Sequence, residues 1–123
     1  MIIEKRTIEF PASFDEMVSS MLLCDQTPGQ TVYQHGQSVL KHFNEICDFI
    51  ETNNLSEDNW KIPDWIKKYG SELTSNLHGS EVISEYLLFH DCGKPFCRVQ
   101  EDGVTRFPNH AEVSSLIWSH VGG

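Results

Sequence analysis

Two helix-capping boxes limit the fold of this chain more than any other feature of its sequence. Ser13-x-x-Glu16 and Thr31-x-x-Gln34 each place a hydroxyl residue three positions before an acid or amide, a pattern that satisfies free N–H groups at a helix start. Apolar residues follow each box at the three- and four-residue spacing of an amphipathic helix. The pattern predicts one helix from Ser13 to the Thr27-Pro28-Gly29 break and a second from Thr31 to about Thr52.

The rest of the chain also favours helices. Pro63 suits the first turn of a third helix that Gly70 would cap at its C-terminal end, and Leu73 and Leu77 suggest another short helical piece. A further helix is predicted from Ser80, with His90 and Asp91 in its last turn before Gly93 and Pro95 stop it. The final helix is predicted to begin at Asn109-x-x-Glu112, a third capping pattern.

Two segments are predicted to be extended. Residues 2–10 alternate loosely and suggest an edge strand or an extended arm. Residues 97–107 suggest a hairpin, because Asp102-Gly103 is a typical two-residue turn between strands. We therefore predict a compact, multi-helix, all-α domain with one small β-hairpin near residues 97–107.

Length and composition narrow the class of protein. The 123 residues suit a single domain, with residues 1–12 as a possible N-terminal arm. We expect a soluble, cytoplasmic protein without a membrane segment, since no run approaches the ~20 apolar residues of a membrane helix and no secretory signal is recognisable. The net charge of −9 argues against a broad nucleic-acid surface. None of the four cysteines forms a Cys-x-x-Cys pair, so we expect reduced, mostly buried thiols.

Three histidines fall near predicted helix ends, where side chains from different elements can converge. These are His35, His90 (next to Asp91) and His110. Imidazoles with a carboxylate form a mixed nitrogen and oxygen site that suits Mn, Fe, Co, Ni or Zn better than Ca, with Mg as a further candidate. The alternative is a half-buried His35, a surface Asp91 beside a helix-end histidine, and an exposed His110 with no metal.

The run Leu88-Phe89-His90-Asp91-Cys92-Gly93-Lys94-Pro95 is specific when it is combined with an early helical His35 and a later Phe107-Pro108-Asn109-His110. Over about residues 31–121 the chain resembles the HD superfamily of metal-dependent phosphohydrolases. The His-Asp-x-Gly-Lys-Pro form is similar to the HD domains attached to some tRNA nucleotidyltransferases.

The resemblance implies an HD-type helical bundle and roles for particular residues. It implies His35, His90 and Asp91 as metal ligands, and His110 as a ligand of a second metal or a phosphate contact. Asp91 would also bridge metals or orient the attacking water, and Lys94 with Arg98 would bind substrate phosphate. The substrate would be a small phosphorylated molecule, preferably a nucleotide, and hydroxide generated on the metal would attack phosphorus.

One departure from the family pattern affects the expected activity. The family's last ligand is an Asp on a later helix, and no acidic residue follows Glu112 in this sequence. We expect this chain to be the front part of a longer protein, so that the family's C-terminal helices are missing from this sequence. Two alternatives are a non-catalytic HD-like module that binds a nucleotide or a partner, and a structural domain whose histidines are incidental.

Overall fold

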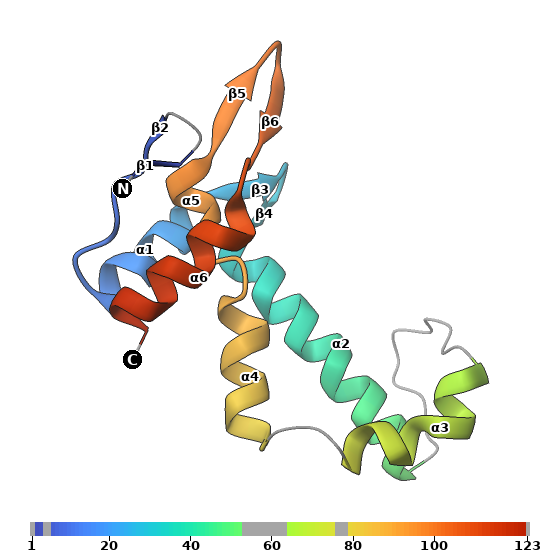
Figure 1. The fold of residues 1–123 in the computed structure, drawn as a ribbon. Coiled ribbons are helices and arrows are strands. Elements are labelled where there is room, and N and C mark those ends of the chain that lie inside the picture. The colour runs from blue at the N-terminus through green and yellow to red at the C-terminus, as the bar shows by residue number, and fades with distance from the viewer. Residues whose placement is uncertain (1, 4–5, 53–63, 76–78, 123) are drawn as a thin grey trace.

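The computed structural model describes residues 2–3, 6–52, 64–75 and 79–122. In these ranges the chain is mainly helical (Figure 1), as the sequence predicts. The helices are α1 (Phe14–Leu23), α2 (Val32–Thr52), α3 (Asp64–Ser75), α4 (Ser80–Phe89), α5 (Lys94–Cys97) and α6 (His110–Val121). The strands are β1 (Ile2–Ile3), β2 (Arg6–Thr7), β3 (Asp25–Thr27), β4 (Gln30–Thr31), β5 (Val99–Glu101) and β6 (Val104–Arg106).

The first two predicted helix starts are confirmed by their hydrogen bonds. The Ser13 hydroxyl accepts from the Glu16 backbone N–H at 3.1 Å. At the start of α2 the exchange is reciprocal, since Thr31 Oγ1 accepts from Gln34 N at 3.1 Å and Gln34 Oε1 accepts from Thr31 N at 2.9 Å. These bonds satisfy N–H groups that lack partners within the helix, and they fix where each helix begins.

The third capping box was predicted wrongly. Asn109 is the residue before α6, but its φ of 60° is left-handed and its side chain makes no capping bond. A capping side chain needs an extended backbone, such as the φ of −151° at Ser13, to reach back over the first turn. Asn109 Nδ2 is instead buried without a hydrogen-bond partner among the described residues.

The segment after α1 is a hairpin and not a continuation of the helix. The helix ends at Leu23, and β3 pairs with β4 in antiparallel fashion. Gly29 lies between the two strands with a φ of 84°, a left-handed value that glycine adopts readily in a tight turn. The Thr27-Pro28-Gly29 break predicted as a helix end is therefore the tip of a β-hairpin. This hairpin places Gln26 beside the site described below.

The β5–β6 hairpin is confirmed, with Val99 opposite Arg106 and positive φ at both Asp102 and Gly103 in the turn. Positive φ at both positions is the geometry of the two-residue turn that the sequence predicts. The described residues hold two further two-stranded antiparallel sheets, β1–β2 and β3–β4, where we predicted one hairpin. The segment predicted as an edge strand or an extended arm thus contains a short antiparallel pair of strands, and Arg6 ties it to the carbonyls of Cys97 and Pro108.

Gly70 lies inside α3 and does not cap it, contrary to the prediction, and Leu73 belongs to the same helix. A Cβ on Gly70 would lie 2.6 Å from Ile50 Cγ1, so the glycine allows α3 to pack closely on α2. Pro63 and Leu77 lie outside the described residues. A glycine that permits close packing therefore resembles, in sequence, a glycine that ends a helix.

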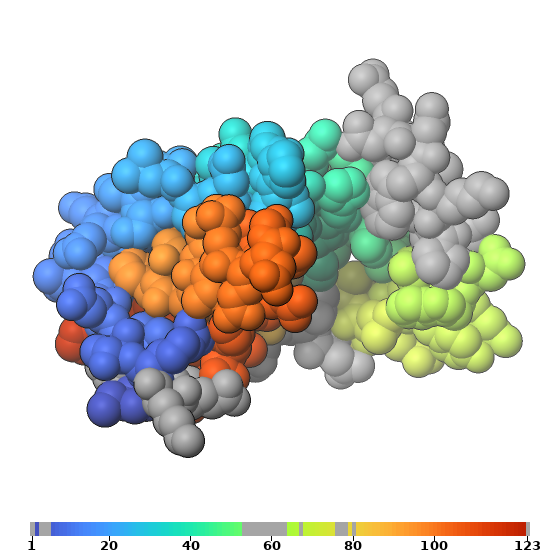
Figure 2. Space-filling model, turned by 90° about the horizontal axis from the view of Figure 1, so that it is seen from above, coloured from blue at the N-terminus to red at the C-terminus, as the bar shows by residue number. Residues whose placement is uncertain are grey.

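The main core lies at the N-terminal end of α2, where α1, α5 and α6 meet (Figure 1). Its buried residues are Ile8, Met17, Met21, Val32, Cys92, Cys97, Val113 and Ile117. A smaller cluster of Phe49 and Ile66 joins α2 to α3 at the other end. The view from above shows α3 on the side of the molecule opposite the N-terminal segments (Figure 2). Within the described ranges, no helix has the length and apolar character that a membrane crossing requires.

Candidate metal centre

The His90-Asp91 pair lies in a turn between two helices. α4 ends at Phe89, His90 is its C-terminal cap, and α5 begins at Lys94. Pro95 was predicted to stop a helix, but it lies in the first turn of α5, where its missing N–H costs nothing. The turn is closed by bonds from Cys92 N to Phe89 O and from Lys94 N to Asp91 O, each 3.0 Å long. His90 and Asp91 thus lie just beyond the last helical turn predicted for them.

Ser114 on α6 fixes the far side of this turn. Its buried hydroxyl accepts from Gly93 N at 2.8 Å, and its carbonyl accepts from the Cys92 thiol at 3.4 Å. A Cβ on Gly93 would lie 2.5 Å from Ser114 N, so only glycine allows this approach. The sequence analysis missed Ser114, because nothing in its spacing relates it to the motif.

Gly36 brings the third candidate ligand to the pair. It is buried in α2, next to His35, and a Cβ there would lie 2.2 Å from the backbone oxygen of Leu88 in α4. The two helices therefore approach closely two residues before His90. This glycine was also missed, although a glycine inside a predicted helix and beside a candidate ligand is a usable signal.

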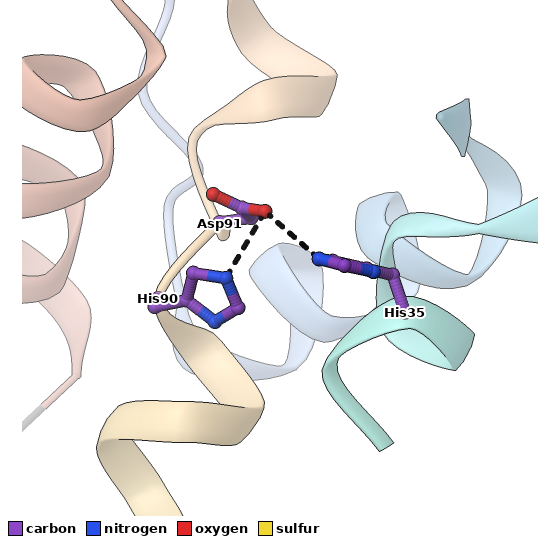
Figure 3. A group of neighbouring side chains, drawn as sticks. All are labelled: His35, His90 and Asp91. Atoms are coloured by element: carbon purple, nitrogen blue, oxygen red, sulfur yellow. Dashed lines mark ion pairs between the residues drawn. The ribbon is translucent and has the colours of Figure 1, made fainter. Parts of the chain in front are cut away.

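The three side chains converge on one carboxylate oxygen (Figure 3). Asp91 Oδ2 lies 3.2 Å from His90 Nε2 and 3.6 Å from His35 Nε2. One ligand atom from each of the three residues can be chosen such that all lie within 4.8 Å of one another, and the residues together can hold a metal ion. Asp91 is only 7 % exposed, so its carboxylate depends on these neighbours for compensation.

Backbone carbonyls orient two of the imidazoles. His90 Nδ1 lies 2.7 Å from Leu87 O, and His110 Nδ1 lies 3.1 Å from Phe107 O. A carbonyl can only accept, so each Nδ1 donates its proton there, and Nε2 is the ring nitrogen left to bind a metal ion. Metal-binding histidines in proteins are commonly held in this way. His110 Nε2 faces the other carboxylate oxygen, Asp91 Oδ1, at 3.7 Å.

Lys94 lies against the same carboxylate. Its Nζ is 3.1 Å from Asp91 Oδ2, and it also donates to Gln26 Oε1 at 3.1 Å. The Phe107 ring lies on another side, with its centroid 5.3 Å from Nζ. The structure thus places Lys94 beside the candidate ligands, together with a glutamine that the sequence analysis did not select.

Arg98 lies in a different setting. It lines an open depression of about 470 Å³ with Ser20, Leu23, Cys24, Asp25 and Pro95. None of the residues that line this depression belongs to the His35, His90 and Asp91 group. Arg98 therefore lines a surface that the three candidate ligands do not share, although it follows Lys94 closely in sequence.

Burial sets the protonation of the neighbouring groups. It lowers the pKa of His35, with Lys94 and His90 adding to the effect and Asp91 opposing it. His35 is thus neutral at pH 7, the form that can bind a metal. Burial raises the pKa of Cys92 to about 11, and it also raises the pKa of Cys97. These thiols are protonated and packed in the core, as the sequence analysis expected of them.

The donor set fits a divalent ion. Ligand atoms on a tetrahedral ion at about 2.0–2.2 Å lie about 3.3–3.6 Å apart, and the distances of 3.2 Å and 3.6 Å from Asp91 Oδ2 to the two Nε2 atoms are already close to this separation. Two imidazoles and a carboxylate match borderline metals better than calcium. No family model, curated protein or solved structure matches this chain.

Proposed function

We propose that this protein binds a divalent metal ion through His35, His90 and Asp91 and hydrolyses a small phosphate ester, preferably a nucleotide. The observation that supports this most directly is the convergence of two Nε2 atoms and one buried carboxylate from α2 and from the turn between α4 and α5. The motif around His90 adds to the support, since it resembles that of HD-type phosphohydrolases. Mn, Fe, Co, Ni and Zn suit these ligands best.

The chain's own groups have distinct tasks in such a reaction. A bound ion would supply an acidified water and polarise a phosphoryl oxygen. Asp91 presents its second oxygen, Oδ1, toward His110, whose Nε2 lone pair can accept a proton or a further ion. Lys94 places a permanent positive charge beside the carboxylate, where a phosphoryl group would gain negative charge.

A second function, binding without turnover, is favoured by one observation. The group of candidate ligands contains a single carboxylate, Asp91, among the residues that the structure describes. A single carboxylate repels a bound phosphate less than several would, so the site can keep a phosphate bound. Nucleotide binding with no phosphate release would therefore support this alternative.

The test combines metal content with turnover. Purified protein is analysed for bound metal, titrated with Mn²⁺, and assayed for phosphate release from a panel of nucleotides and simple esters. We expect His35→Ala and Asp91→Ala to abolish metal binding and turnover together. His42→Ala is the matched control, because His42 lies on the exposed face of the same helix. A wild-type protein that neither contains nor binds any divalent metal would refute both functions.

A further inference from the structure

Asp91 is a buried charge whose compensation is uneven. Its side chain is 10 % exposed, and four nitrogen atoms face it, from His35, His90, His110 and Lys94. Only the Lys94 ammonium is a permanent cation among them. An isolated carboxylate at this depth would be costly, so Lys94 is the group that makes Asp91 tolerable in metal-free protein.

The ammonium occupies the same side of the carboxylate as two of the candidate ligands. Lys94 Nζ is 3.1 Å from Oδ2, and the Nε2 atoms of His90 and His35 are 3.2 Å and 3.6 Å from that oxygen. An ion bound by these histidines and Oδ2 would lie within a few ångströms of the ammonium. Like charges so close repel strongly in a partly buried site.

Gln26 offers the ammonium a second partner. Lysine can only donate, so the amide oxygen of Gln26 must face Nζ, as the 3.1 Å contact requires. The amide nitrogen in turn donates to Gln30 Oε1 at 3.1 Å across the β3–β4 hairpin. This second bond fixes the direction of the amide. The hairpin thus holds a preoriented acceptor for Lys94 that is independent of Asp91.

We propose that Lys94 competes with the metal ion for Asp91 Oδ2, and that Gln26 retains the ammonium when the ion displaces it. The inference rests on the proposed metal centre and names the residues that regulate its occupancy. Lys94 neutralises Asp91 in metal-free protein. After displacement the ammonium is held by Gln26 and Phe107, and its positive charge is then available to the anion that the site binds.

Two opposite effects on metal affinity follow. Lys94→Met removes the competing charge and tightens binding. Gln26→Leu removes the second partner and weakens binding, because the ammonium of this variant still has Asp91 in the metal-free protein but has no side-chain acceptor left once the ion displaces it. The Gln26 effect requires Lys94, so it disappears in the double variant.

The experiment is calorimetric titration with Mn²⁺ alone, without phosphate or nucleotide. We expect the Kd of Lys94→Met to fall about tenfold relative to wild type, and that of Lys94→Arg to stay within about threefold, because the arginine keeps the competing charge. Gln26→Leu should raise the Kd about threefold or more, and Lys94→Met/Gln26→Leu should match Lys94→Met. The control Gln100→Leu changes an exposed glutamine of β5 and should match wild type.

Thermal melts with and without Mn²⁺ provide a second readout. The metal-induced rise in Tm should be larger for Lys94→Met than for wild type, and Lys94→Gln serves if the methionine variant does not fold. Lys94 variants that bind Mn²⁺ no more tightly than a wild type that does bind it would overturn the inference and leave the metal centre standing. An equal effect of Gln26→Leu with and without Lys94 would overturn the role of Gln26. Absence of Mn²⁺ binding in every variant would refute the metal centre itself.

Discussion

The close approach of α2 and α4 at Gly36 gives the most direct test of how the site is held together. A Cβ added to Gly36 would lie 2.2 Å from Leu88 O, whereas ordinary contacts begin at 3.4 Å. The atom it meets is backbone, so no side chain can rotate away. Gly36→Ala must therefore separate the two helices locally by about 1 Å, which moves His35 relative to His90.

The magnitude follows from two opposing effects. Overpacking of this kind costs about 1–3 kcal/mol, while alanine in a helix gains about 1 kcal/mol over glycine. The net cost is about 0–2 kcal/mol, so we expect the free energy of unfolding to fall by about 1 kcal/mol, which lowers Tm by about 4 °C in a domain of this size. The displaced imidazole should weaken Mn²⁺ binding about tenfold or more, in line with the cost of disturbed ligand support.

The assay is a thermal melt and a Mn²⁺ titration of Gly36→Ala beside Gly79→Ala. Gly79 is the N-cap of α4 and has open space around its Cβ position with a negative φ, so alanine there should cost at most about 1 kcal/mol through the cap and leave Mn²⁺ affinity unchanged. A Gly36→Ala protein with wild-type Tm and wild-type Mn²⁺ affinity would show that the helices do not need this contact. A lower Tm with unchanged affinity would show that the contact supports the fold but not the ligands.

Three further predictions concern single groups around the site. Ser114→Ala leaves the buried Gly93 N–H without its acceptor and should lower the free energy of unfolding by about 1–3 kcal/mol in a denaturant titration, while the exposed Ser115→Ala should change it little. Because the pKa of His35 is lower when folded than its ordinary value of 6.5, the unfolded chain binds more protons between those two pH values. The stability of the metal-free protein should therefore fall as pH drops below about 6.5, and His35→Asn should reduce this slope in melts at several pH values. Cys92, with a pKa of about 11 and no exposure, should resist alkylation at pH 8 in native protein and react in denaturant, as measured by mass spectrometry.

Local signals in the sequence predicted what depends on local bonds. The capping boxes at Ser13 and Thr31 and the Asp102-Gly103 turn each act within four residues, and each is present in the structure. Glycine and proline signals were less informative, because the same residue can end a helix or allow another helix to approach. Gly70 and Pro95 were misinterpreted for that reason, and only the packing of α3 on α2 and the start of α5 resolve their roles.

The candidate ligands were predictable because the motif places His90, Asp91 and Lys94 within five residues, and His35 lies early in a well-marked helix. The groups that position them were not, since they come from distant segments. Gly36 contacts α4, Ser114 bonds to the turn from α6, and Gln26 bonds to Lys94 from a hairpin whose sequence does not alternate. Their roles depend on tertiary contacts that spacing along the chain does not encode.

This difference between ligands and positioning groups limits what a sequence motif can predict about metal affinity. The motif identifies the atoms that can bind an ion, but the affinity also depends on what compensates the carboxylate when the ion is absent. In this chain that compensation is Lys94, a residue of the motif itself, and its contact with Asp91 is as short as any imidazole contact to that carboxylate. On the proposed competition, a site with the same ligands and no such lysine would hold its metal more tightly. It would also lack a positive charge for the phosphoryl group, so the proposal gives weaker metal binding and anion binding the same physical origin.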